Sequence, residues 1–413
     1  MKAQWGVLAE HRDFRRLFGG SSLSLLGSSV TTVALPLTAV LVLGASPVQM
    51  GLLGAVSFLP HLVLGLPAGV WIDRMSYRGV IVGADLLAAV ALAAVPILAA
   101  LGLLQMWHLY VVVVVTGACS LFSAIAAQSF APMLVPPREL LTANSAFALS
   151  NSVVATSGSA LGGVLVQLLT APVAIAVDAA SLLLSAISKA RITVTGRSTA
   201  ADLPKESMFK GIWGGVRAAL EHPALRATTI AATVGALAGQ MQAVIMVLFL
   251  VHELRLSAGL VGLVIAVAGV AGIVGALIGV QITARLGNGP AFIVGMTLSG
   301  LAGLVMAAAG GPPALVLAVV ILAQLLRGWG PTLYGINQQT IRQTLVAPEL
   351  LARTQATWRF LVFGMQPIGA LLGGTLGALA GFRATLVISS LIMLTGTTLA
   401  LLSPLRTLRL LSG

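Results

Sequence analysis

Twelve long apolar runs dominate this sequence and limit its fold more than any other feature. A helix needs about 20 apolar residues to cross the roughly 30 Å of hydrocarbon in a bilayer. The runs cover residues 17–43, 48–72, 79–103, 107–131, 141–169, 172–190, 224–251, 257–283, 289–310, 313–339, 353–380 and 382–404. We therefore expect an all-α polytopic membrane protein with twelve transmembrane helices.

The composition excludes several classes of protein. Of the 413 residues, 58% are hydrophobic and only 8% are charged, whereas soluble domains have about 25% charged residues. Cys119 is the single cysteine, so an intramolecular disulfide and a multi-cysteine metal site are excluded. The sequence has no Gly-Lys-Ser/Thr nucleotide loop and no His-Glu-x-x-His motif. We expect no enzyme activity, no cofactor and no bound metal.

The net charge of +12 indicates membrane topology rather than nucleic-acid binding, because positive residues concentrate on the cytoplasmic side. With the N-terminus in the cytoplasm, all of the 23 lysines and arginines are cytoplasmic except Arg255, Arg327 and Arg383. The opposite orientation would reverse this bias. We therefore predict a multi-pass protein of the cell inner (plasma) membrane with both termini in the cytoplasm, and with the first span retained rather than cleaved.

The two halves of the chain resemble each other. Residues 128–144 have a counterpart in 339–353, at an offset of 211 that becomes 210 after a one-residue gap, and the glycine pattern of 158–163 recurs at an offset of 211 in 369–374. A parallel repeat of this kind indicates a duplicated six-helix bundle.

We therefore expect three parts: an N-terminal bundle over 1–190, a cytoplasmic linker over 191–222 and a C-terminal bundle over 223–413. The linker is polar up to residue 207. Its apolar residues then recur at helical spacing over 208–220, which predicts an amphipathic helix on the membrane surface.

The loop after the second run carries the first dense group of charges beyond the N-terminus. Gly69 would let a neighbouring helix approach closely, and Asp73 could lie against the positive end of another helix. Arg74 and Arg78 would hold the turn on the cytoplasmic side. These four residues are a candidate conformational latch; an ordinary basic turn accounts for them equally well.

This loop resembles the loop between spans 2 and 3 of the major facilitator superfamily, Gly-x-x-x-Asp-Arg-x-Gly-Arg-Arg/Lys. Ser76 and Tyr77 replace its second glycine and the arginine that follows. Further likeness over 14–17 and 337–374 is to the twelve-span drug:proton antiporter branch, which includes macrolide-efflux and enterobactin-exporter-like proteins. The resemblance implies two bundles that alternate around a substrate site near the middle of the membrane, lined by spans 1, 4, 7 and 10.

Polar residues on those spans and on span 11 are candidates for the substrate cavity. They are Ser24, Ser28, Thr31, Thr116, Ser120, Ser123, Gln240, Gln324, Arg327, Tyr334 and Gln366. The hydroxyl residues would also suit close helix packing, with bonds back to their own carbonyls. Arg327 would suit an anionic or hydrogen-bonding group of the substrate, or a structural ion pair.

Three ionisable residues inside the spans are candidates for proton coupling: His61, Asp85 and Asp178. Members of the antiporter branch often carry an acidic residue in span 1, where this chain has Ser28. His61 could instead be a neutral residue bonded inside the bundle. Asp85 could belong to a charge network with the latch loop, and Asp178 could be capped by Ser181 or line an outer vestibule.

The resulting hypothesis is a monomeric secondary exporter of amphipathic small molecules, such as drugs, macrolides or siderophore-like compounds. Its partners would be the small-molecule substrate, protons and the lipid bilayer, and not nucleic acid. A lipid or lysolipid flippase is one alternative. A transport-inactive membrane receptor or scaffold is another, because the acidic residue of span 1 is missing.

Overall fold

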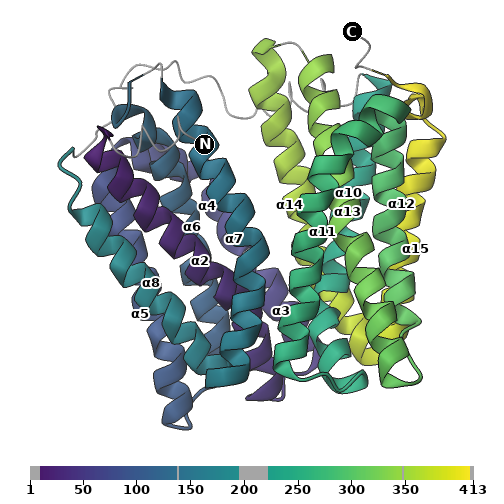
Figure 1. The fold of residues 1–413 in the computed structure, drawn as a ribbon, viewed down its shortest axis with the longest axis horizontal. Helices are drawn as coiled ribbons and strands as arrows, with labels where there is room; N and C mark the ends of the chain where they lie inside the picture. The colour runs from purple at the N-terminus through teal and green to yellow at the C-terminus, as the bar shows by residue number, and fades with distance from the viewer. Residues whose placement is uncertain (1–9, 137–138, 195–221, 347, 410–413) are drawn as a thin grey trace. The chain divides into compact units, whose positions relative to one another are not determined.

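The computed structural model describes residues 10–136, 139–194, 222–346 and 348–409, and all regular structure in these ranges is helical (Figure 1). The helices are α2 Arg12–Leu41, α3 Pro47–Ser57, α4 Leu59–Asp73, α5 Tyr77–Ala100, α6 Met106–Phe130, α7 Leu140–Leu169, α8 Ala171–Ala190, α10 Pro223–Leu248, α11 Ala258–Leu286, α12 Asn288–Ala307, α13 Pro313–Leu345, α14 Pro348–Leu379 and α15 Phe382–Leu401. The predicted helix over 208–220 lies outside the described residues.

Each of the twelve predicted spans coincides with helical structure in the described ranges, which confirms the predicted fold class. Eleven stretches there are long and apolar enough to cross a membrane.

The predicted span 48–72 is not one continuous helix. It is interrupted at Phe58, between α3 and α4. Pro60 lies in the first turn of α4. Proline has no amide hydrogen, and its ring collides with the carbonyl four residues earlier, so it weakens the helix at this point and is well placed in the first turn of a new one. The hydropathy pattern could not show the break because the stretch is apolar on average, with Ser57 and His61 as its isolated polar residues.

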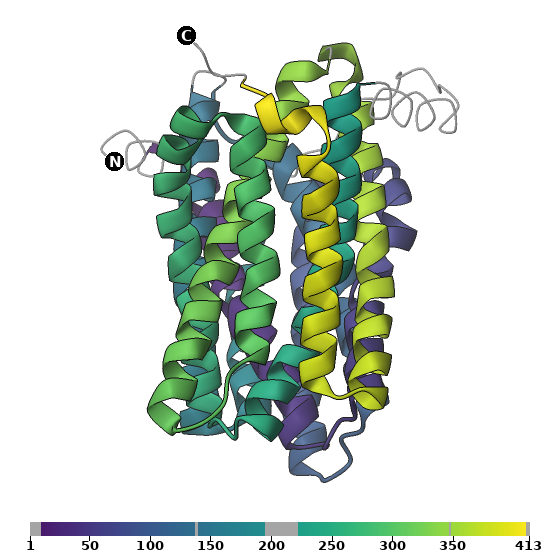
Figure 2. The same ribbon diagram turned by 90° about the vertical axis from the view of Figure 1, so that its right-hand side faces the viewer.

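The chain forms two compact units. Unit 1 consists of Met1–Ala45, Val56–Leu203 and Ser257–Leu263, and unit 2 of Ser46–Ala55, Pro204–Leu256 and Val264–Gly413. Figure 2 shows the long helices of unit 2 running side by side.

The two units repeat one pattern of helix packing. In unit 1, α2 packs on α7 and α8, and α5 packs on α6 and α8; in unit 2, α10 packs on α14 and α15, and α12 packs on α13 and α15. The starts of α2, α5 and α8 are related to those of α10, α12 and α15 by one constant offset. The sequence repeat is therefore also a repeat of structure.

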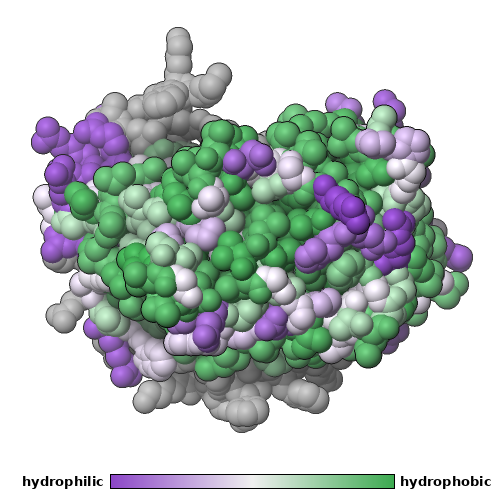
Figure 3. All heavy atoms as spheres, turned by 90° about the horizontal axis from the view of Figure 1, so that it is seen from below, coloured by the Kyte–Doolittle hydropathy of each residue, from purple (hydrophilic) through white to green (hydrophobic). Residues whose placement is uncertain are grey.

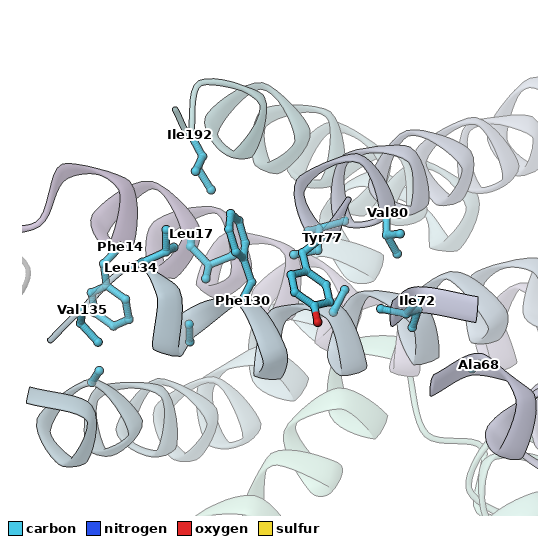
Figure 4. Close-up of a cluster of buried hydrophobic side chains, with 14 residues drawn as sticks. Phe14, Leu17, Ala68, Ile72, Tyr77, Val80, Phe130, Leu134, Val135 and Ile192 are labelled. Carbon is cyan, nitrogen blue, oxygen red and sulfur yellow. The ribbon is translucent and has the colours of Figure 1, made fainter. Parts of the chain in front are cut away.

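Each unit has its own apolar cluster. In unit 1, Phe14, Tyr77 and Phe130 come from three different helices and are buried together (Figure 4), and the rings of Tyr77 and Phe130 lie 6.2 Å apart. In unit 2, Phe292 and Met296 of α12 are part of the corresponding cluster. These contacts fix the helices that carry the candidate functional residues.

Apolar side chains also cover much of the outside. Hydrophobic residues make up most of the surface visible in Figure 3. Leu168, Leu277 and Leu379 are 74%, 72% and 86% exposed. A soluble monomer rarely shows such continuous apolar surface, whereas a lipid-facing surface requires it.

Candidate functional site

Asp178 of α8 is a buried carboxyl group surrounded by hydroxyl groups. It is 1% exposed. Thr31 Oγ1 donates to Asp178 Oδ2 at 2.5 Å, and Ser181 Oγ donates to Oδ1 at 3.3 Å. No lysine, arginine or histidine of the described residues forms an ion pair with it. A Cβ atom added at Gly27 would collide with Ser181 and Asp178, so this glycine lets α2 approach the carboxyl group.

Asp85 of α5 has a different environment, because a cation lies beside it. Lys189 Nζ donates to Asp85 Oδ2 at 2.8 Å, and both residues are 3% exposed. Ser185 Oγ donates to the same oxygen at 2.7 Å, and Ser123 Oγ to Oδ1 at 3.5 Å. Both charges are thus neutralised inside unit 1, as the burial of an ion pair requires.

The partner Lys189 was missed at the level of sequence, where it was counted only as a cytoplasmic charge. The signal was nevertheless present. Asp178, Ser181, Ser185 and Lys189 follow one another at steps of three, four and four, which places them on one face of α8. That polar face meets α2 and α5.

The third candidate for proton coupling, His61, lies on α4 with its side chain exposed. Both buried carboxyl groups are on other helices, α5 and α8. Burial therefore distinguishes the two aspartates from the histidine.

The structure divides the predicted hydroxyl residues of spans 1 and 4 into groups. Thr31 and Ser123 donate to the two carboxyl groups, and Thr116 Oγ1 donates to a carbonyl of its own helix at 2.8 Å. Ser24 is half-buried, and Ser28 and Ser120 are exposed. Two of the residues proposed for a substrate cavity are therefore also neighbours of the buried acids.

In unit 2, Arg327 of α13 lines a small pocket without a carboxylate partner among the described residues. Its Nη1 lies 2.7 Å from Met246 Sδ. Gln324 is 1% exposed; its Nε2 donates to Val264 O at 3.0 Å, and its Oε1 has no partner. The pocket is lined by Gln242, Met246, Ala302, Gly303, Met306, Ala323, Gln324, Arg327 and Leu386.

The other candidates of unit 2 lie on three helices. Gln240 of α10 is half-buried. Tyr334 of α13 packs edge-on against Phe292, with ring centroids 6.0 Å apart. Gln366 of α14 has a buried Oε1 without a hydrogen-bond partner. An unpaired amide oxygen of this kind can accept a bond from a substrate or water.

The latch residues are described in part. Arg78 Nη1 donates to the carbonyl of Ile192 at 2.7 Å, which ties the start of α5 to the end of α8 within unit 1. Arg74 is exposed. The surroundings of Gly69 and of the Asp73 side chain lie outside the described part of the structure.

One group of side chains in the described residues brings potential metal ligands together: Glu10, His11 and Glu139, with ligand atoms within 4.8 Å of one another. His11 Nε2 and Glu139 Oε2 form an ion pair at 2.8 Å. Glu10 is exposed.

Comparison with known proteins identifies related efflux proteins. The chain is 28% identical to macrolide efflux protein A of Streptococcus pyogenes over 127 residues, and these aligned residues make up 31% of each protein. The match thus spans about a third of that relative. The multidrug efflux pump Tap of Mycolicibacterium fortuitum is 27% identical over 376 residues, 89% of this chain and 90% of Tap.

Solved structures show the same fold at low sequence identity. The nucleoside transporter NupG, as its D323A mutant, matches with a TM-score of 0.79 and 11% identity over 94% of this chain and 99% of that one. A bacterial homologue of the iron transporter ferroportin matches with a TM-score of 0.74 and 18% identity, over 94% and 98%. The family model described as "Transmembrane secretion effector" matches residues 3–411. The chain belongs to this family of major facilitator superfamily transporters, and it is a transporter rather than an enzyme.

Proposed function

We propose that the protein exports amphipathic small molecules, such as drugs, macrolides or siderophore-like compounds, by alternating access coupled to protons. Its relatives named as efflux proteins support the direction and the kind of substrate. The distribution of basic residues supports a position in the cell inner membrane with both termini in the cytoplasm.

The observation that carries the proton coupling is the burial of Asp178 without a cation. A lone carboxylate inside a membrane bundle is far more costly than a neutral carboxylic acid. Thr31 lowers that cost with a hydrogen bond to the carboxylate, and Ser181 shares its hydroxyl proton between this carboxylate and the backbone carbonyl of Asp178, but neither residue supplies a charge. Asp178 thus takes up a proton when it is enclosed and releases it when water reaches it.

Asp85 is the second buried carboxyl group, and its environment differs from that of Asp178. Its ion pair with Lys189 compensates the carboxylate permanently, so proton uptake there would leave a buried lysine without its partner. We therefore assign Asp85 a structural role and Asp178 the coupling role. Thr31 connects α2 to Asp178, so a movement of α2 along α8 would change the hydration of the carboxyl group.

The test uses purified protein in proteoliposomes with an imposed pH gradient, and ethidium and erythromycin as probes. We expect Asp178→Asn to reduce gradient-driven transport to the background of empty vesicles, because the asparagine cannot carry a proton. Exchange of probe across the membrane without a gradient should persist. Thr38→Val is the matched control on α2, because Thr38 is also buried but bonds only to Ala34 of its own helix.

Gradient-driven transport by Asp178→Asn at the wild-type rate would refute the coupling role. The same vesicles separate the alternative functions. Movement of a fluorescent lysolipid without movement of ethidium would indicate a flippase. Binding of the probes without any flux would indicate a receptor or scaffold.

A further inference from the structure

Four buried hydrogen-bond donors without a partner gather where α13 ends and α14 begins. The atoms are Arg342 Nη1, Thr354 Oγ1, Thr357 Oγ1 and Trp358 Nε1. Arg342 is in the last turn of α13. The other three residues are on α14, where Thr357 and Trp358 follow Thr354 by three and four positions and so lie on the same side of the helix as Thr354. The guanidinium carbon of Arg342 lies 4.5 Å from the centre of the Trp358 ring, which joins the two helices at this cluster.

Burial makes the lack of partners significant. Arg342, Thr354 and Thr357 are 7%, 2% and 4% exposed. Buried polar groups in proteins are almost always hydrogen-bonded, and an unpaired buried donor destabilises the fold. The described residues provide no carboxylate for Arg342. The cluster can therefore donate several hydrogen bonds and carries a positive charge that nothing in it balances.

The repeat places an apolar residue of unit 1 where α13 carries the charge of this cluster. With the offset of 211 that relates the two halves, Arg342 corresponds to Ala131, which is 5% exposed. The offset becomes 210 at the start of α14, where Leu350 and Leu351 correspond to Leu140 and Leu141, so Thr354 corresponds to Asn144. The guanidinium group of the cluster therefore has an apolar counterpart in unit 1, whereas Thr354 has a polar one.

We propose that this donor cluster binds the phosphate group of an anionic phospholipid. A guanidinium group with hydroxyl and indole donors complements an oxyanion, which has only acceptors and a negative charge. Basic pockets between membrane helices at the cytoplasmic side bind acidic lipid headgroups. Arg359 is exposed beside the cluster, and Phe360 is 63% exposed next to it, which suits a charged headgroup with an acyl chain below it.

Free phosphate offers the same acceptors without the acyl chains, so the test separates the two sources. The thermal unfolding midpoint of the full chain is measured in detergent with added phosphatidylglycerol, phosphatidylcholine or inorganic phosphate, at matched ionic strength. We expect phosphatidylglycerol to raise the midpoint most. A rise with inorganic phosphate of equal size would still support an oxyanion site, with a soluble anion as its occupant.

The decisive variant is Thr354→Val/Thr357→Val, which keeps the shape of both side chains and removes two donors. We expect the phosphatidylglycerol concentration for half of the effect to increase at least about tenfold, because a hydrogen bond to a charged group contributes that much or more. Without lipid the variant should be as stable as the wild type or more stable, because two unpaired hydroxyl groups are gone. This second result shows that the variant folds.

Thr397→Val is the matched control. Thr397 is 4% exposed on α15, and its hydroxyl group donates to Met393 O of its own helix. It should respond to lipid like the wild type. An unchanged lipid response in the double variant would overturn the proposal, as would a wild-type midpoint that neither phosphatidylglycerol nor phosphate raises above the salt control. The measurement is of unfolding, so it does not depend on the proposed proton coupling.

Discussion

Asp85 and Asp178 are buried to the same degree, and their surroundings give them different properties. Lys189 neutralises Asp85, whereas the side chains that bond to the Asp178 carboxylate among the described residues are hydroxyl donors. The difference has a direct consequence for stability, because breaking a buried pair leaves one charge uncompensated.

We expect Asp85→Asn and Lys189→Met each to destabilise the protein by about 3–5 kcal/mol. The double variant Asp85→Asn/Lys189→Met should cost much less than the sum of the two single variants, because it buries no lone charge. The measurement is a double-mutant cycle on unfolding in detergent. Glu253→Gln is the control, because its pair with Arg383 is partly exposed, and such pairs contribute about 1 kcal/mol or less. If the double variant lost as much stability as the two single variants together, Asp85 and Lys189 would not be coupled as a buried ion pair.

At the scale of single helices, the sequence predicted where the membrane spans lie, because hydropathy controls their positions. The runs of apolar residues located the spans because a bilayer demands them. The break at Phe58 was missed because proline acts through backbone geometry, which hydropathy does not register. Close helix contacts could also not be predicted, because the sequence does not distinguish a glycine needed for packing from any other glycine.

Gly330 and Gly335 of α13 make this last point testable. A Cβ atom at Gly330 would lie 2.7 Å from Ser299 N and 2.8 Å from Gly295 O, whereas one at Gly335 would have nothing within 4 Å. We expect Gly330→Ala to destabilise the protein by about 1–3 kcal/mol, because α12 must move away. Gly335→Ala should be neutral or stabilise by up to about 1 kcal/mol. The measurement is the thermal unfolding of the two variants. Equal changes in stability would show that α12 and α13 do not pack this closely.

At the scale of the whole chain, the orientation in the membrane remains a prediction from charge. We expect Arg74→Cys and Leu103→Cys to lie on opposite sides, in a background in which Cys119 is replaced by alanine. Both positions are exposed. A membrane-impermeant maleimide should label Leu103→Cys in intact cells and Arg74→Cys only after permeabilisation. The reverse labelling would place the termini outside.

The candidate residues were harder to predict than the fold, for a physical reason. Asp85 and Asp178 were recognised because charge inside a membrane is costly wherever it occurs. The local partner Ser181 of Asp178 was also predicted, whereas Lys189 was not, because its contact with Asp85 joins residues far apart in the chain. The donors of Arg342 and Trp358 were not predicted to form a group, because they come from two helices that meet only in the folded chain.

The repeated packing of the two units has one more consequence. Asp85, Asp178 and Lys189 correspond by the common offset to Met296, Ser389 and Ala400, all of them buried. Ionisable side chains are therefore present at these buried positions of one half and absent from the same positions of the other. The two halves of the repeat share their backbone plan but are not interchangeable in chemistry.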